Sequence, residues 1–189
     1  MIKNILFIIP HPDDEIVGAS KIIRKFIKQK KNIIIFFLTN GIISKNSMWI
    51  WKRKNYEHYL SVRLDEMKSS MNQLGINKYF FQNIPSRTLK DNIKNTYKKI
   101  QKIINNQKID TIFCPSYEGG HQDHDVANFI CSRFKNVKSI FEFAEYNFFN
   151  KKINSNLFFN NTNKETILKL SKNDKEFKIK CLKIYDSEK

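Results

Sequence analysis

Apolar and polar residues follow two different periods along the chain. Short apolar runs, typical of strands buried on both faces, alternate with stretches whose apolar residues recur every three or four positions, as on one helix face. The clearest helical stretch carries one stripe that we expect to lie in the core: Leu60, Leu64, Met67, Met71 and Leu74. Strands are predicted over residues 4–10, 32–39, 78–82, 110–115 and 139–146. Further helices are predicted around 16–27, 89–104, from 123 or 124 onward and around 177–185, and a hairpin over 156–171.

Strands that alternate with helices predict an α/β fold. We expect a Rossmann-like three-layer sandwich, with a mostly parallel sheet and helices on both faces. The chain has 189 residues and shows no internal repeat, low-complexity linker or break in composition, so we expect a single domain over residues 1–189.

The longest unbroken apolar run, residues 33–38, is far shorter than the roughly 18 residues that a membrane helix needs. We therefore expect a soluble protein without a transmembrane segment. The N-terminal apolar run is interpreted as the first strand, because no small-residue cleavage site of a signal peptide follows it. Cys114, Cys131 and Cys181 are odd in number and widely spaced, which favours reduced thiols and a cytoplasmic location.

The formal net charge of +16 suggests a nucleic-acid partner, since basic surfaces attract phosphate. However, only five of the 34 basic residues are arginines, whereas base recognition favours the bidentate guanidinium group. The lysines are also spread along the whole chain. We therefore interpret the charge as solvated helix faces and expect no specific nucleic-acid binding.

Two polar clusters directly follow predicted strands. The first is HPDDE, residues 11–15, and the second is SYEGGHQDHD, residues 116–125. Open α/β sheets bind ligands at the carboxyl ends of their strands, and the first and fourth strands of a Rossmann-like sheet are neighbours. We therefore expect the two clusters to face one crevice and to share a metal ion. The candidate ligands are His11, Asp14, His121 and His124.

A set of three nitrogen and oxygen ligands with an open fourth position is typical of catalytic zinc sites. A structural interpretation exists for each cluster alone. Acidic residues stabilise the first turn of a helix, and isolated histidines are usually structural. The occurrence of both clusters at equivalent strand ends favours a functional metal site over the structural interpretation.

The motifs HPDDE and HQDH, each after an apolar strand, resemble the two signatures of the PIG-L / LmbE-like zinc-dependent N-deacetylases, which remove acetyl groups from amino sugars. Three further segments are similar to parts of this family: LTNG (38–41), RLDEMKSSMNQLG (63–75) and KIKCLKIYDSEK (178–189). The resemblance therefore covers nearly the whole chain.

The resemblance implies His11, Asp14 and His124 as ligands of Zn²⁺, with Fe²⁺ or another divalent metal also compatible. It implies Asp13 as the general base, which takes a proton during attack by water and returns it to the departing amine. It also implies that His121, when protonated, stabilises the oxyanion of the tetrahedral intermediate.

Other roles are less directly implied. Asp123 is expected to orient one of the imidazoles. Arg63 resembles the substrate-contacting arginine of the family, and an exposed pair with Glu66 is the alternative. Glu15 is expected to be either an acid in the first helical turn or a support for the metal ligands.

Some features depart from the family pattern or stay ambiguous. Gly119 stands where some family members carry a tyrosine, and Tyr117 is a candidate replacement. The long connection over residues 41–56 carries Trp49 and Trp51, which we expect either to form a lid that contacts substrate or to plug the core.

We therefore expect metal-dependent hydrolysis of an N-acetyl group from an amino sugar or its conjugate, of the GlcNAc type, in glycan or glycolipid biosynthesis. The expected substrate is an N-acetylated amino sugar, a nucleotide sugar or a glycolipid. Two alternatives remain: a non-catalytic glycan or nucleic-acid binding module, and a metal-dependent amidase for a different acyl amine. Asp13 argues against a binding module, because a binder needs no base beside the metal.

Overall fold

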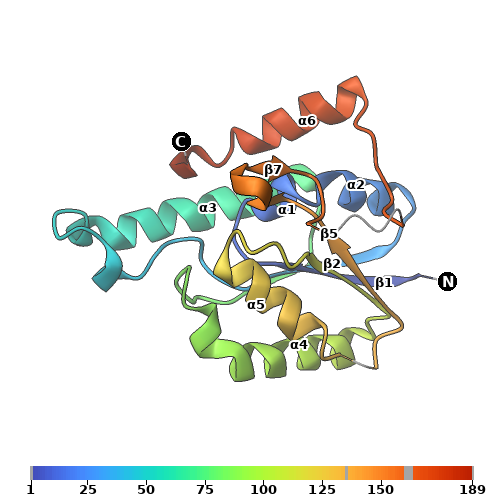
Figure 1. The fold of residues 1–189 in the computed structure, drawn as a ribbon, viewed down its shortest axis with the longest axis horizontal. Helices are drawn as coiled ribbons and strands as arrows, with labels where there is room; N and C mark the ends of the chain where they lie inside the picture. Colours follow the sequence, from blue (N-terminus) through green and yellow to red (C-terminus); the bar gives the residue numbers. More distant parts are fainter. Residues whose placement is uncertain (1, 135, 160–163, 189) are drawn as a thin grey trace.

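Five parallel strands form the central sheet in the order β3-β2-β1-β4-β5 (Figure 1). The structure, a computed structural model, describes residues 2–134, 136–159 and 164–188. The strands are β1 (Asn4–Ile9), β2 (Asn32–Phe37), β3 (Tyr79–Phe81), β4 (Thr111–Pro115) and β5 (Ser139–Phe143). Each strand lies within a predicted one, and β1 pairs with β4 as expected. The predicted α/β fold is therefore confirmed.

Helices cover both faces of this sheet (Figure 1). One face carries α1 (Asp14–Val17), α2 (Ser20–Lys28), α3 (Tyr56–Leu74) and α6 (Lys172–Leu182). The other face carries α4 (Ile93–Gln107) and α5 (Gln122–Cys131). The 3₁₀ turns are η1 (Lys45–Ser47), η2 (Arg53–Asn55), η3 (Leu89–Asn92), η4 (Phe149–Lys151) and η5 (Asp186–Glu188). In the described part of the chain, no helix is both long and apolar enough to cross a membrane.

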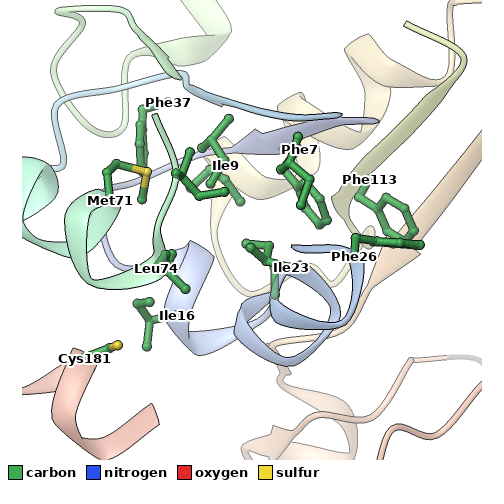
Figure 2. Packing of buried hydrophobic residues seen from close by; sticks show 14 of the residues in the cluster. Phe7, Ile9, Ile16, Ile23, Phe26, Phe37, Met71, Leu74, Phe113 and Cys181 are labelled. Carbon is green, nitrogen blue, oxygen red and sulfur yellow. The ribbon is translucent and has the colours of Figure 1, made fainter. Parts of the chain in front are cut away.

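The sheet is buried on both sides because successive side chains of a strand point to opposite faces. In β1, Phe7 and Ile9 belong to the cluster under α1, α2, α3 and α6, whereas Leu6 and Ile8 belong to the cluster under α4 and α5. Figure 2 shows members of the first cluster packed together, including Phe7, Ile9, Ile23, Phe26, Met71 and Leu74. The predicted stripe of α3 therefore reaches the core through Met67, Met71 and Leu74.

Two predicted elements differ from the structure. The helix expected around residues 16–27 is interrupted after Val17, whose carbonyl accepts a hydrogen bond from Lys178 Nζ at 2.6 Å. The hairpin predicted over residues 156–171 is wrong for its described residues, 156–159 and 164–171, which contain no strand; residues 160–163 lie outside the described part. An antiparallel pair instead occurs upstream, between β6 (Tyr146–Asn147) and β7 (Asn154–Ser155).

Candidate metal-dependent active site

The two polar clusters meet at the carboxyl ends of β1 and β4. After β1 the chain turns through His11 into α1, and after β4 it passes through His121 into α5. The rings of His11 and His121 have centroids 4.5 Å apart, and those of His11 and His124 are 5.2 Å apart. The structure thus brings the predicted metal-binding histidines together, because parallel neighbours end at the same edge of the sheet.

One carboxylate oxygen lies at the centre of this cluster. Asp14 Oδ2 is 3.1 Å from His11 Nδ1 and 3.2 Å from His124 Nε2, and it accepts a hydrogen bond from the His11 backbone amide at 2.8 Å. Potential ligand atoms of His11, His121 and His124 lie within 4.8 Å of one another, as do those of Asp14, His124 and Glu145. Nitrogen and carboxylate donors in such an arrangement fit a divalent metal ion.

The same proximity changes the protonation of these groups. Burial favours the neutral form of both His11 and Asp14, but their mutual charge and hydrogen bond favour the ion pair. The net effect raises the pKa of His11 to about 10 and, with the charge of His124 as the largest opposing cause, holds the pKa of Asp14 well below its usual value. Asp14 is therefore ionised, as a metal ligand must be.

Asp13 sits on a strained turn beside these ligands. Its φ of 134° lies in a region that residues with a side chain rarely adopt. Its carboxylate makes no hydrogen bond with another described residue, and burial, followed by the charges of Asp14 and Glu15, raises its pKa well above the usual value. A carboxyl group with an elevated pKa and no hydrogen-bond partner is suited to proton transfer.

Glu15 holds the strained turn in place. Its side chain is fully buried, and Oε2 accepts a hydrogen bond from the Asp13 backbone amide at 3.0 Å. Oε1 accepts hydrogen bonds from Ser70 of α3 and from the Tyr185 hydroxyl, at 2.5 and 2.7 Å. Burial raises the pKa of Glu15 to about 7. These contacts identify Glu15 as a buried support of the turn, rather than only an acid in the first helical turn.

His121 and Asp123 are linked through the start of α5. His121 caps this helix, because its Nδ1 accepts a hydrogen bond from the Asp123 backbone amide at 3.2 Å. The ring proton therefore lies on Nε2. Burial, then the charges of His11 and His124, lower the pKa of His121 to about 4. This lowered pKa favours the neutral imidazole of His121, and the role of His121 in stabilising an oxyanion stays a prediction.

Asp123 lies against His11 from the opposite side to Asp14. Its Oδ2 is 3.0 Å from His11 Nε2 and accepts a hydrogen bond from the Arg87 backbone amide at 2.6 Å. The carboxylate is fully buried. Asp123 is thus in position to fix the His11 ring, the kind of contact that the sequence led us to expect.

Glu145, which sequence reasoning missed, is a further acidic group at this site. It follows β5, is 2% exposed, and neither of its carboxylate oxygens has a hydrogen-bond partner among the described residues. Oε2 lies 3.9 Å from His124 Nδ1. Glu118 fixes this segment by accepting hydrogen bonds from the backbone amides of Glu145 and Tyr146, at 2.7 and 2.9 Å. The available signal was an acidic residue at the carboxyl end of the strand next to β4.

Arg63 lies behind the HPDDE turn and is only 1% exposed. Its Nη1 donates to the Pro12 carbonyl at 2.9 Å, and its Nη2 contacts the Glu188 carboxylate. The pair with Glu66 exists, at 3.5 Å, but it is buried, so the alternative of an exposed pair is wrong. In this structure Arg63 supports the turn; its contact with substrate stays a prediction.

The aromatic residues expected near the site are placed differently. Tyr117 is 66% exposed, whereas the ring centroid of Tyr146 lies 5.9 Å from that of His124. Trp49 and Trp51 are 68% and 62% exposed, so they do not plug the core. Tyr146 is therefore the described tyrosine whose ring contacts a candidate ligand.

The fold and the donor set define an α/β protein with a candidate metal site at the carboxyl ends of neighbouring parallel strands. A family model described as PIG-L, GlcNAc-PI de-N-acetylase, matches residues 6–135, and the chain belongs to this family. A comparison with curated proteins finds no match by sequence.

Solved structures with this fold include several deacetylases. The N,N'-diacetylchitobiose deacetylase from Pyrococcus horikoshii is 21% identical, with a TM-score of 0.68 over 99% of this chain and 71% of that one. A triple mutant of a deacetylase of teicoplanin biosynthesis is 14% identical, with a TM-score of 0.75 over 98% and 83%. The zinc-inhibited form of teicoplanin deacetylase Orf2 is 12% identical, with a TM-score of 0.72 over 98% and 85%. At these identities the likeness concerns the fold.

Proposed function

We propose that the protein is a zinc-dependent N-deacetylase that hydrolyses the N-acetyl group of an amino sugar or its conjugate. The observation that carries this proposal is the division of labour between adjacent aspartates. Asp14 is ionised between two histidines, whereas Asp13 presents a carboxyl group of raised pKa without a hydrogen-bond partner. A site that only bound a metal or a glycan would need the first of these groups and not the second.

In this mechanism His11, Asp14 and His124 would hold the ion, and the carboxylate of Glu145 faces the outer nitrogen of His124. When bound, the metal supplies Lewis acidity, which polarises the amide carbonyl and acidifies water.

The chain supplies the proton transfers. Asp13 accepts a proton from the attacking water and returns it to the departing nitrogen, so the C–N bond breaks with a neutral amine, and not an amide anion, as the leaving group. His121 donates its Nε2–H to the carbonyl oxygen as negative charge develops there. Asp123 keeps the His11 ring oriented during these steps, through its contact with His11 Nε2.

Membership of the PIG-L family, whose model is described as a GlcNAc-PI de-N-acetylase, supports a GlcNAc-type substrate. The structural neighbours named as deacetylases of diacetylchitobiose and of teicoplanin biosynthesis agree with an acetylated sugar or glycoconjugate. We further propose a role in glycan or glycolipid biosynthesis. A cytoplasmic location is proposed because Cys114, Cys131 and Cys181 are all free and buried.

The first experiment is a screen for amine release from N-acetylated sugars, nucleotide sugars, glycolipids and other N-acylated amines. On the best substrate, Asp13→Asn should retain metal and substrate affinity, because Asp14 and both histidines are unchanged. Its single-turnover rate should fall by about 100- to 10,000-fold, or ~3–5 kcal/mol in barrier height.

Two further variants are controls for this experiment. His124→Ala should lose the metal itself, and Asp65→Asn, an exposed carboxylate on α3 paired with Lys68, should leave both properties unchanged. If Asp13→Asn retains metal and releases amine at the wild-type rate, the assignment of the base is wrong. A screen that detects hydrolysis only of non-sugar amides would instead support the amidase alternative.

A further inference from the structure

The loop before α3 carries a small, strongly exposed apolar tip. Trp49, Ile50 and Trp51 are consecutive and are 68%, 74% and 62% exposed; we call these three residues the tryptophan tip. Figure 1 shows that the segment between β2 and α3 extends away from the body of the molecule. Large apolar side chains that are exposed together mark an interaction surface, whereas single exposed apolar residues need no explanation.

The conformation of this tip is fixed by contacts within the loop. The two indole rings are stacked, with centroids 5.1 Å apart and planes at 10°. Arg53 Nε donates to the Met48 carbonyl at 3.0 Å, and Arg53 Nη2 donates to the Asn46 carbonyl at 2.7 Å. The loop is therefore clamped from within, and the apolar side chains are presented outward in a defined arrangement.

The surroundings of the tip are cationic. Lys45, Lys52 and Lys54 are exposed and form no ion pair with another described residue. No acidic residue occurs between Gly41 and Tyr56. An aromatic surface that binds a sugar would combine a free ring face with hydrogen-bond acceptors. Here the two indole rings cover each other, and the neighbouring charged side chains are cationic.

We propose that the tryptophan tip is an interfacial anchor for an anionic lipid bilayer. The indole rings suit the boundary between headgroups and acyl chains, where an apolar ring and a polar N–H can both be accommodated. The three lysines would contact lipid phosphates and the negative surface potential. This inference is independent of the proposed deacetylation, because either property can hold without the other.

The chain provides its own probe for this proposal, since Trp49 and Trp51 are its only two tryptophans. Intrinsic fluorescence therefore reports on the tip alone. Addition of phosphatidylcholine vesicles that contain phosphatidylglycerol should shift the emission to shorter wavelength. Brominated acyl chains in those vesicles should quench it. Pure phosphatidylcholine should have a much weaker effect, and salt should weaken the response to anionic vesicles.

Two triple variants separate the tip from the general positive charge of the protein. Each lysine near an anionic surface strengthens binding by about fivefold, so removal of all three from the loop should weaken binding by roughly 100-fold. The loop variant is Lys45→Gln with Lys52→Gln and Lys54→Gln. The matched control, from an exposed face of α4, is Lys94→Gln with Lys98→Gln and Lys102→Gln. The control should lose much less affinity although its net charge is the same.

A Trp49→Ser and Trp51→Ser double variant, followed by co-sedimentation with the same vesicles, tests insertion separately from charge. It should sediment far less than wild type while its far-UV circular dichroism stays unchanged, because both side chains are exposed. Vesicle binding without an emission shift, or binding that both lysine variants lose equally, would overturn the proposal. An emission shift with N-acetylglucosamine oligomers but not with vesicles would also overturn it, in favour of a sugar-binding tip.

Discussion

Replacement of Glu145 by Gln tests whether this buried carboxylate acts on the metal site through His124. Glu145 Oε2 lies 3.9 Å from His124 Nδ1, while His124 Nε2 faces Asp14 on the other side of the ring. A metal bound at Nε2 leaves a proton on Nδ1, and a carboxylate is a better acceptor for it than an amide. Two full charges at this separation would interact by ~4 kcal/mol at an effective dielectric constant of about 20.

The ring carries only part of the charge of the ion, so the expected loss is smaller. Removal of such a supporting acceptor typically weakens metal binding by about 10- to 100-fold, or ~1.4–2.7 kcal/mol. The stability of the metal-free protein should not fall in this variant, in contrast to its metal affinity. Burial, then the charge of Asp14, raise the pKa of Glu145 well above its usual value, so its ionisation above the unfolded-state pKa destabilises the fold. At neutral pH, metal-free Glu145→Gln should therefore be at least as stable as wild type.

Competition with a chromophoric chelator measures the metal affinity of Glu145→Gln and of the wild type. Thermal unfolding in the presence of chelator measures the stability of their metal-free forms. The visible spectrum of the cobalt-substituted protein adds a reading of the ligand field. Glu142→Gln is the matched control, because Glu142 lies on β5, three residues before Glu145, but is exposed and accepts a hydrogen bond from Asn128 Nδ2 at 2.8 Å. An unchanged metal affinity and cobalt spectrum in Glu145→Gln would refute the coupling through His124. A loss of both stability and affinity would indicate general damage instead.

Two other predictions concern contacts around α1 and α2, one between α6 and α2 and one between Gly18 and Glu145. The hydrogen bond from Lys21, followed by those from Ser171, lowers the pKa of Asp174, so the stabilisation by Asp174 is present above its unfolded-state pKa and is lost as pH falls through the folded value. Asp174→Asn should therefore unfold at a lower temperature than wild type at neutral pH, with a difference that shrinks in acid; a constant difference across pH would contradict this. At Gly18 a Cβ would lie 2.5 Å from Glu145 Oε1. Gly18→Ala should therefore lower the free energy of unfolding by about 1–3 kcal/mol, measured by urea titration. An unchanged free energy of unfolding would show that Glu145 can move freely.

The sheet and the two polar clusters could be predicted because their sequence signals are local. A strand buried on both faces has a continuous apolar run, and the polar residues that follow it in sequence also follow it in space. Residues 4–9 and 111–115 thus located His11 and His124 at one edge of the sheet. Short elements gave no such signal, and β6 and β7 have only two residues each.

The environments of Arg63 and Glu15 could not be predicted because they depend on contacts between distant segments. The Arg63 guanidinium is buried by the Pro12 carbonyl and by Glu188, which are far from it in sequence. The helical spacing of Arg63 and Glu66 is equally compatible with an exposed ion pair and with a buried arginine. The sequence pattern alone therefore leaves open whether a charged residue faces substrate or supports the turn, and the tertiary structure is needed to place it.

One support of the candidate base comes from a part of the chain that the family match does not include. The match ends at residue 135, yet Tyr185 donates to Glu15, and Glu15 in turn accepts from the Asp13 amide. Glu145 also lies beyond it and faces His124. A turn with a φ of 134° is costly for an aspartate, so it persists only if neighbouring contacts hold it. The C-terminal segment therefore helps to support this turn, because the Tyr185 hydroxyl and Ser70 both hold Glu15 Oε1 while Glu15 Oε2 accepts from the Asp13 amide.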